Sequence, residues 1–436
     1  MSIRLRSAAV PALLAVLTAA PAGGQALTPV ERRIAAYAEV HAEEAIGLLE
    51  RTVNVNSGTG NLAGVREVGR MFAAQLDSLG FETRWVELPD SLGRAGHLFA
   101  ERRGSRGKRL LLIGHLDTVF EKDSPFQLFQ RSGGTAAGPG TNDMKGGDVI
   151  IVYALRALEA AGALRDRRIV VAMTGDEENP GRPLSISRAA LIEAGKAADA
   201  ALEFEGASRD STGRETVVTS RRSSGAWTLR VTARPGHSSG VFGEGVGSGA
   251  IYEAARILEA FRTQLREPGL TYSAALALGG TEVRFDSTAS RGTASGKTNV
   301  IPASAVVTGD IRTLTDDQLR RTQERMRAIV AASLPETRAR IAFDEGYPSM
   351  PPTEGNLAIL ATLNEIDRAL GLRPADPNDP ARRGAGDISF VAPYVSGVGG
   401  LGADGAGSHT DRETIDLTTL PRQVTRAALL IYRLTR

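Results

Sequence analysis

Histidine and carboxylate side chains recur in short polar motifs along this chain, most of them after an apolar or glycine-rich run. Nitrogen and oxygen ligands of this kind, without sulfur, suit a hydrolytic site that holds zinc, manganese or cobalt. The motifs are GHLDTV (114–119), GPGTNDMKGG (138–147), GDEEN (175–179), EFEG (203–206) and SHTDRETID (408–416).

The first motif puts His115 and Asp117 two residues apart directly after an apolar run. In an extended segment such side chains point to the same side. The carboxylate can then orient the imidazole or join it at one metal. The alternative is a capping histidine beside a turn aspartate.

Two further motifs concentrate carboxylates at predicted turns. Asp143 lies in a glycine-rich turn that lacks the spacing of the known phosphate-binding loops, so a cation ligand is the better interpretation. Asp176, Glu177 and Glu178 are adjacent, and such a cluster raises its own pKa values unless a cation offsets the repulsion. A solvated acidic loop is the alternative for these three.

Composition narrows the chemistry further. The 436 residues include no Cys and five His, with 52 Lys and Arg against 50 Asp and Glu. The lack of Cys excludes disulfide scaffolds, thiolate zinc sites, iron–sulfur clusters and cysteine nucleophiles. The balanced charge argues against a nucleic-acid partner. A carboxylate-rich set of five candidate ligands exceeds what one catalytic zinc needs, which favours two metals.

The elements that must position these residues follow from hydrophobic periodicity. Apolar runs at 108–114, 168–174 and 200–205 indicate strands buried on both faces, and helical patterns at 149–164 and 187–194 alternate with them. This alternation predicts an α/β fold with a mostly parallel sheet covered by helices. Functional groups then gather beyond the carboxyl ends of the strands.

The pattern changes near residue 218. Period-two alternation at 227–233 and 306–312, with amphipathic helices at 248–265 and 316–334, predicts a separate α+β unit inserted into the first. The expected organisation is a catalytic domain in two parts, 27–217 and 347–436, around an inserted domain at 218–346. Pro348, Pro351 and Pro352 mark the return crossing.

The first 26 residues have the pattern of a secretory signal peptide. Arg4 and Arg6 precede an apolar stretch at 8–20, which is too short to span a bilayer, and small residues follow it. We therefore expect an exported protein, periplasmic or secreted, without a stable membrane anchor. Retention of this segment as an anchor is the alternative.

In their order and approximate spacing, the five motifs resemble those of the di-zinc exopeptidase and amidohydrolase family. This family includes glutamate carboxypeptidase (carboxypeptidase G), aminoacylase and succinyl-diaminopimelate desuccinylase, and the likeness is greatest to the glutamate carboxypeptidase branch. The resemblance implies a zinc exopeptidase-like catalytic domain with an inserted dimerisation and lid domain. It also implies two divalent metal ions, zinc first, with cobalt or manganese as alternatives.

The resemblance carries over residue by residue. Asp143 matches the carboxylate that bridges both metals. His115 and Glu205 would complete one metal site, and Glu178 and His409 the other.

Three more carboxylates are weighed in the same way. Asp117 resembles the carboxylate that orients His115, and Glu177 matches the general acid/base. Glu203 competes with Glu205 as the last ligand, and the Gly206 turn directly after Glu205 favours Glu205.

The inserted domain matches the family at three substrate-binding positions. His237 resembles a histidine that reaches into the partner subunit's site, while Asn299 and Arg312 resemble residues that contact the substrate carboxylate; a simple turn histidine is the alternative for His237. The segment 344–352 lacks an Arg that glutamate carboxypeptidases supply there, so a preference for C-terminal glutamate stays open. Asp387, in a glycine-rich turn, is left without a role.

The resulting hypothesis is a homodimeric, metal-dependent hydrolase. It would cleave the amide bond of a small peptide or N-acyl amino acid with a free carboxylate, using a water activated by two metals and Glu177. One alternative is a deacylase of a non-peptide amide. Another is a periplasmic binding protein that has lost catalysis, against which the presence of Glu177 argues.

Overall fold

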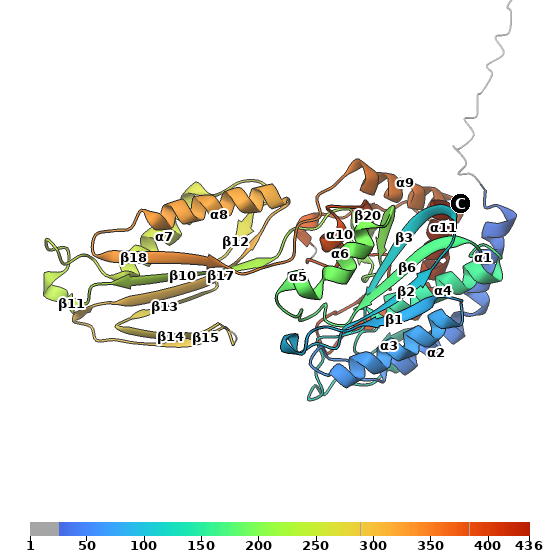
Figure 1. Cartoon of the computed structure of the whole chain (residues 1–436), viewed down its shortest axis with the longest axis horizontal. Coiled ribbons are helices and arrows are strands. Elements are labelled where there is room, and N and C mark those ends of the chain that lie inside the picture. Colours follow the sequence, from blue (N-terminus) through green and yellow to red (C-terminus); the bar gives the residue numbers. More distant parts are fainter. Residues whose placement is uncertain (1–25, 288, 383) are drawn as a thin grey trace, which may run out of the picture.

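The computed structural model describes residues 26–287, 289–382 and 384–436. Apart from residue 26, the predicted signal peptide therefore lies outside the described residues. The chain forms a large and a small lobe joined by a narrow crossing (Figure 1). Among the residues that the structure describes, no helix has the length and apolar character needed to cross a membrane.

A six-stranded sheet forms the centre of the large lobe. Its central strands run parallel, as predicted, while β1 and β2 form an antiparallel edge. The short connection between β1 and β2 explains this edge, because parallel neighbours need a long crossover. In spatial order the strands are β1 (Glu82–Val86), β2 (His97–Arg102), β6 (Arg167–Thr174), β3 (Arg106–His115), β7 (Ala200–Glu203) and β20 (Gly397–Val398).

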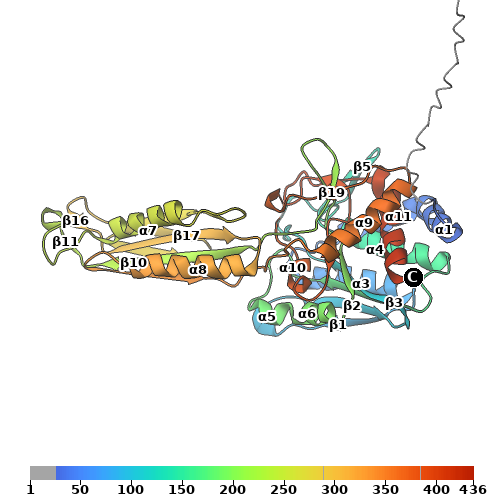
Figure 2. The same ribbon diagram turned by 90° about the horizontal axis from the view of Figure 1, so that it is seen from above.

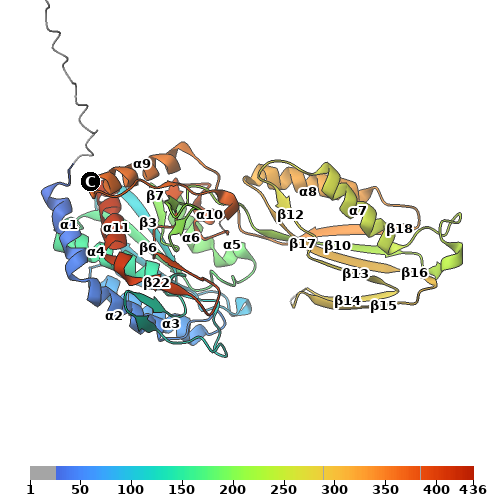
Figure 3. The ribbon, with the colours of Figure 1, turned by 180° about the vertical axis from the view of Figure 1, so that it is seen from behind.

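Helices cover both faces of this sheet. Leu110 and Leu112 of β3 join one buried cluster, whereas Leu111 and Ile113 join a second on the opposite face. This alternation explains why the run is apolar throughout. The helices are α1 (Pro29–Val40), α2 (Ala42–Val53), α3 (Leu62–Asp77), α4 (Lys145–Ala160), α5 (Leu184–Ser187), α6 (Ala189–Lys196), α9 (Glu354–Ala369), α10 (Ile388–Val391) and α11 (Leu420–Thr435). α4 packs against α11 (Figure 3).

Short strands complete the large lobe beside the main sheet. Sheet β21-β22-β5-β4 and sheet β19-β9-β8 both tie segments that are distant in sequence. Their bounds are β4 (Gln130–Ser132), β5 (Thr135–Ala137), β8 (Ser208–Arg209), β9 (Glu215–Val217), β19 (Asp376–Pro377), β21 (Gly405–Ala406) and β22 (Thr414–Asp416).

The small lobe is the predicted α+β unit. Antiparallel strands β12 (Thr271–Tyr272), β17 (Ser304–Arg312), β10 (Gly225–Ala233) and β18 (Thr337–Phe343) lie in that order, with β13 (Leu276–Gly280) also paired to β17. Helices α7 (Ala250–Gln264) and α8 (Asp316–Ala331) cover one face of this sheet (Figure 2). Its hydrophobic cluster draws only on residues between Trp227 and Phe343, so this lobe has its own core.

Two short antiparallel pairs extend the small lobe. β14 (Glu282–Asp286) pairs with β15 (Arg291–Ser295), and β11 (Gly236–His237) pairs with β16 (Val300–Ile301). The β11–β16 pair lies at the end of the lobe farthest from the large lobe (Figures 1 and 3).

The crossing between the lobes is a pair of antiparallel segments. Arg221 and Met350 exchange backbone hydrogen bonds of 2.8 and 2.9 Å, and Ser224 and Tyr347 exchange bonds of 3.0 and 2.8 Å. The return segment thus passes beside the outgoing one, in the proline-containing stretch where the sequence predicts the return.

Candidate metal centre

The polar motifs meet at the carboxyl end of the parallel strands. His115 is the last residue of β3, Glu177 and Glu178 follow β6, and Glu205 follows β7. Asp143 lies on the turn before α4. Parallel neighbours end at the same edge of a sheet, so the topology alone brings these segments together.

Asp143 lies between two histidines. Its Oδ1 is 3.2 Å from Nε2 of His115, which is also 3.3 Å from Oε1 of Glu205. Its Oδ2 is 3.2 Å from Nε2 of His409, which is also 3.1 Å from Oε2 of Glu178. The structure therefore brings all five predicted ligands together, in the two groups that the family resemblance implies.

Glu177 adjoins the same space. Ligand atoms of His115, Glu177 and Glu205 lie within 4.8 Å of one another, as do those of His115, Asp143 and Glu178. Glu177 is therefore close to two of the proposed ligands, His115 and Glu205, which is where a general acid/base would act.

Asp117 holds both a histidine and a loop. Its Oδ1 is 3.4 Å from Nδ1 of His115. Its carboxylate also accepts the Thr59 hydroxyl at 2.6 Å and the N–H groups of Glu177 and Glu178 at 2.9 and 3.1 Å. Asp117 is completely buried, so these contacts orient the imidazole and the loop that carries Glu177 and Glu178.

Glu203 and Glu205 have different surroundings. The Glu203 carboxylate forms a buried ion pair with Arg221 and accepts the N–H of Ile388 at 3.0 Å. Glu205 instead lies beside His115. Because Glu203 is committed to Arg221, the geometry favours Glu205 as the ligand.

Glu413 supports the turn that carries Asp143, and sequence reasoning missed it. Its carboxylate accepts the N–H groups of Gly140, Asn142 and Asp143 at 3.2, 2.8 and 2.9 Å. Glu413 is fully buried. Its place in the SHTDRETID motif was the only signal, since the same letters also describe an exposed acidic loop.

Three groups of the cluster have raised pKa values. Burial raises the pKa of Glu178 to about 7, and the nearby Asp143 charge adds to this effect. Hydrogen bonds to Asp143 and Glu178 raise the pKa of His409 to about 11. Burial disfavours the charged form of His115, but hydrogen bonds to carboxylates such as Asp117 outweigh it and raise its pKa well above the usual range.

The donor set fits divalent metal ions. Oε1 of Glu178 is buried and has no hydrogen-bond partner among the described residues. Carboxylates outnumber histidines in the cluster, and like charges in a buried site require compensation. Imidazole nitrogens and carboxylate oxygens without thiolates match the ligands that zinc, cobalt and manganese accept.

The three predicted substrate-binding residues lie in the small lobe. His237 and Asn299 are exposed at the far end, where the N–H of Ser238 donates to the Asn299 carbonyl at 3.0 Å. Arg312 ends β17 and donates to Asp310 at 3.1 Å. Within the described part of one chain, His237 and Asn299 therefore lie together but apart from the metal ligands (Figure 1).

Two of the remaining polar residues have structural partners. Asp387 accepts a hydrogen bond from Nε of Arg188 at 2.8 Å and from the Thr174 hydroxyl at 2.6 Å. His97 is fully buried, and its Nε2 lies 2.7 Å from the Ser187 carbonyl oxygen.

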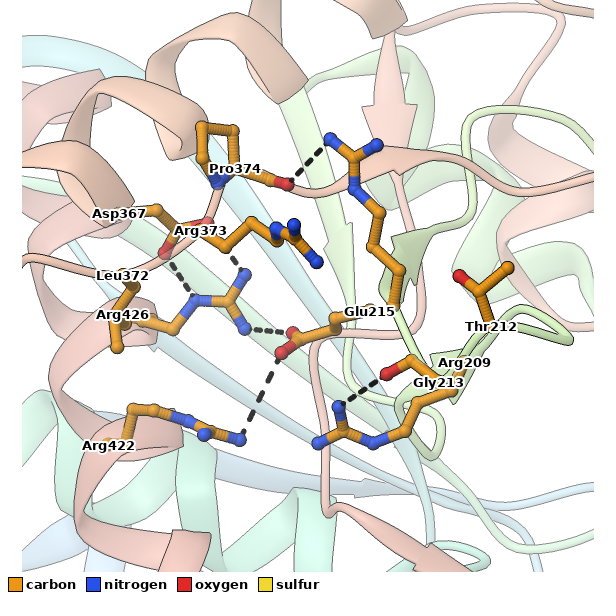
Figure 4. Close-up of a pocket in the computed structure, with 11 residues that line it drawn as sticks. Arg209, Thr212, Gly213, Glu215, Asp367, Leu372, Arg373, Pro374, Arg422 and Arg426 are labelled. Atoms are coloured by element: carbon orange, nitrogen blue, oxygen red, sulfur yellow. Dashed lines mark hydrogen bonds and ion pairs between the residues drawn. The ribbon is translucent and has the colours of Figure 1, made fainter.

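An arginine-rich pocket of about 180 Å³ lies on another part of the large lobe (Figure 4). Arg426 pairs with Asp367 at 2.7 Å and with Glu215, and Arg214 pairs with Asp376 at 2.5 Å. Arg209 and Arg422 both pair with Asp404. These ion pairs hold β8, β9, α9 and α11 together, so the pocket is part of the scaffold.

Comparison with protein families identifies the chain's relatives. The model of Peptidase family M20/M25/M40 matches residues 111–433. This range includes every proposed metal ligand and the whole small lobe.

Two curated proteins are similar over most of their length. Carboxypeptidase G2 of Pseudomonas sp. (strain RS-16) is 29% identical over 443 residues, covering 97% of this chain and 97% of that protein. A succinyl-diaminopimelate desuccinylase of Nitrosospira multiformis is 26% identical over 385 residues, covering 82% of this chain and 92% of that protein.

Two solved structures share the fold. The aminopeptidase PepT of Bacillus cereus has a TM-score of 0.72 at 16% identity and covers 90% of this chain and 98% of its own. The M20 family metallo-carboxypeptidase Sso-CP2 of Sulfolobus solfataricus has a TM-score of 0.62 at 14% identity and covers 89% of this chain and 98% of its own.

Metal binding should release protons. Hydrogen bonds to carboxylates raise the pKa of His115 and raise that of His409 to about 11, so His409 is protonated at pH 8 and must lose its proton to bind metal. We expect proton release on metal binding, and an affinity for Zn²⁺ that falls from pH 8 to pH 5, because protons compete with the metal for His409 and Glu178. Calorimetric titration with Zn²⁺ in buffers of different ionisation enthalpy measures both quantities. A pH-independent affinity without proton release would contradict the proposed ligands.

Glutamine substitutions separate the two candidate glutamates. Glu205→Gln should lower the metal content per chain, because a neutral amide replaces a carboxylate ligand. Glu203→Gln should leave the metal content unchanged and lower the thermal unfolding midpoint, because it leaves the buried Arg221 without its counter-charge. Mass spectrometry for metals and thermal unfolding give the two readouts. The opposite pattern would make Glu203 the ligand.

Proposed function

The chain belongs to Peptidase family M20/M25/M40, and on that premise we propose that it hydrolyses the amide bond of a small peptide or N-acyl amino acid with a free carboxylate. As a member of this family it is a metal-dependent hydrolase. The observation that carries the proposal is the Asp143 carboxylate, whose two oxygens each lie 3.2 Å from a different histidine.

We assign two divalent metal ions, most simply zinc, to this cluster. Asp143 would contact both ions, with His115 and Glu205 on one side and Glu178 and His409 on the other. When bound, such ions act as Lewis acids toward the amide carbonyl and make water acidic enough to ionise near neutral pH. The unpartnered oxygen of Glu178 supports the assignment.

Glu177 is the proposed general acid/base. Burial raises its pKa well above the usual range, so its carboxyl group takes up a proton more readily than an ordinary glutamate does. It would accept a proton from the attacking water and deliver that proton to the leaving nitrogen. The hydrogen bond from its N–H to Asp117 orients it for both steps.

The inserted lobe supplies the proposed substrate contacts. Arg312 and Asn299 would bind the substrate carboxylate, and His237 would donate to the oxyanion. His237 and Asn299 lie together at the outer end of the small lobe, so we assign both to the site of the partner subunit in a homodimer (Figure 1). On this basis the inserted lobe acts in dimerisation and as a lid.

Two relatives guide the substrate class. The name carboxypeptidase G2 denotes release of a C-terminal residue, and succinyl-diaminopimelate desuccinylase denotes removal of an N-acyl group. Both reactions hydrolyse an amide near a carboxylate. From the sequence of residues 1–26 we further propose that the enzyme is exported to the periplasm or secreted.

A substrate panel tests the reaction. Metal-loaded enzyme should hydrolyse members of a panel of dipeptides, acyl-glutamates, N-acetyl amino acids and N-succinyl amino acids, and should lose activity when the free carboxylate is converted to an amide. Glu177→Gln should keep its metal and lower kcat by about 10²- to 10⁴-fold, because the proton carrier is gone.

Three results of these experiments would contradict the proposed function or the role of Glu177. Stoichiometric binding of the panel compounds without turnover would favour a binding protein. Equal loss of metal and activity in Glu177→Gln would make Glu177 a ligand. Turnover of amides without any carboxylate would favour a deacylase of non-peptide amides.

Mixed dimers test the shared site. His237→Ala and Glu177→Ala should each have low activity, and mixing after reversible dissociation should restore about a quarter of wild-type activity, because half the dimers gain one complete site of two. Activity measured before and after mixing provides the readout, with each variant mixed with itself as the control. No recovery in verified heterodimers would place His237 outside the partner's site.

A further inference from the structure

Tyr347 connects the crossing between the lobes to the loop that carries Glu177. Its backbone exchanges hydrogen bonds with Ser224 in the crossing. Its phenol donates to the carbonyl oxygen of Glu177 at 2.9 Å. A residue of the inter-lobe connection therefore touches the peptide next to the proposed general acid/base.

A buried ion-pair network fixes the phenol. Nη2 of Arg188 donates to Oη of Tyr347 at 3.1 Å. Arg188 is completely buried and pairs with Asp176 at 2.6 Å and with Asp387 at 2.8 Å. Moving the phenol would leave a buried guanidinium donor without an acceptor, which is costly.

Glu345, two residues before Tyr347, contacts the end of the same loop and the start of α5. The Glu345 carboxylate accepts the N–H groups of Leu184 and Ser185 at 2.6 and 3.3 Å, and the Glu345 carbonyl accepts a hydrogen bond from Arg182. The Tyr347 ring also packs against Phe390, with the centroids 4.8 Å apart. The return segment of the crossing is thus attached to the loop after β6 and to the start of α5.

These contacts hold one peptide unit from both ends. The peptide between Glu177 and Glu178 donates its N–H to Asp117 at 3.1 Å and offers its C=O to Tyr347. Asp117 also faces His115, whereas Tyr347 belongs to the crossing. The orientation of this peptide determines where the side chains on either side of it point.

We propose that Tyr347 is a positioning residue for Glu177. Through Tyr347, the position of the crossing, and hence of the inserted lobe, affects the position of the general acid/base. This inference rests on the proposed role of Glu177. Tyr347 does not touch the metal ligands through its phenol; it acts by fixing the Glu177 carbonyl. A shift of the crossing would turn the Glu177 carboxylate away from the attacking water, and small displacements of such groups cost large factors in rate.

Tyr347→Phe tests this role, because it removes the hydroxyl and keeps the ring. We expect kcat to fall about tenfold or more, with KM within about twofold and an unchanged metal content. Tyr272→Phe is the matched control, since the Tyr272 hydroxyl also donates to a backbone carbonyl, that of Phe261, but lies within the small lobe. This control should keep the wild-type kcat.

A second readout is independent of turnover. In metal-free protein, hydrogen–deuterium exchange of a peptide spanning residues 175–181 should be faster in Tyr347→Phe than in wild type, and unchanged in Tyr272→Phe. Glu345→Gln weakens the same attachment without altering the phenol, and it should also lower kcat at constant KM and speed the exchange. This second variant keeps the test available if Tyr347→Phe folds poorly.

The outcomes distinguish a failure of the positioning role of Tyr347 from a failure of the proposed function. Wild-type kcat and wild-type exchange in both Tyr347→Phe and Glu345→Gln would overturn the positioning role. An equal loss of kcat in Tyr347→Phe and Tyr272→Phe would also overturn it, because the effect would then be general destabilisation. A wild-type enzyme without any amide turnover would defeat the proposed function, while the exchange experiment would still decide whether Tyr347 holds the Glu177 loop.

Discussion

The repulsion among buried carboxylates around Asp143 is the constraint on which the large lobe is organised. Asp143, Glu177, Glu178 and Glu205 share one space with two histidines. Such a cluster is stable only when protons or cations offset its charge. Asp117 and Glu413 are two further buried carboxylates: Asp117 orients the His115 imidazole, and Glu413 accepts the N–H of Asp143 and so holds its turn. Divalent ions would displace protons from the cluster and would offset the negative charge of its carboxylates.

Part of this site could be predicted because strand ends and ligands coincide in the sequence. β3 and β6 are continuous apolar runs buried on both faces, and His115 and Glu177 come at or just after their ends. β1 and β2 were missed because neither has a long apolar run: β1 is the edge strand and includes Glu82 and Arg84, and the apolar run of β2 ends at Ala100.

The supporting network could not be predicted, since its members are far apart in sequence. Arg188 joins Asp176 to Asp387 and then contacts Tyr347, and no local pattern distinguishes these residues from exposed charged ones. Asp387 illustrates the difference: in the sequence it is an aspartate of a glycine-rich turn without a role, and in the structure it balances a buried guanidinium. The crossing that carries the small lobe is therefore attached to the large lobe by specific hydrogen bonds as well as by the chain itself.

Asp143 would bridge two metal ions, and anomalous diffraction from crystals of the zinc-loaded protein tests this arrangement most directly. We expect two peaks per chain, one between His115 and Glu205 and one between Glu178 and His409, each beside one oxygen of Asp143. A single peak, or peaks away from Asp143, would contradict it.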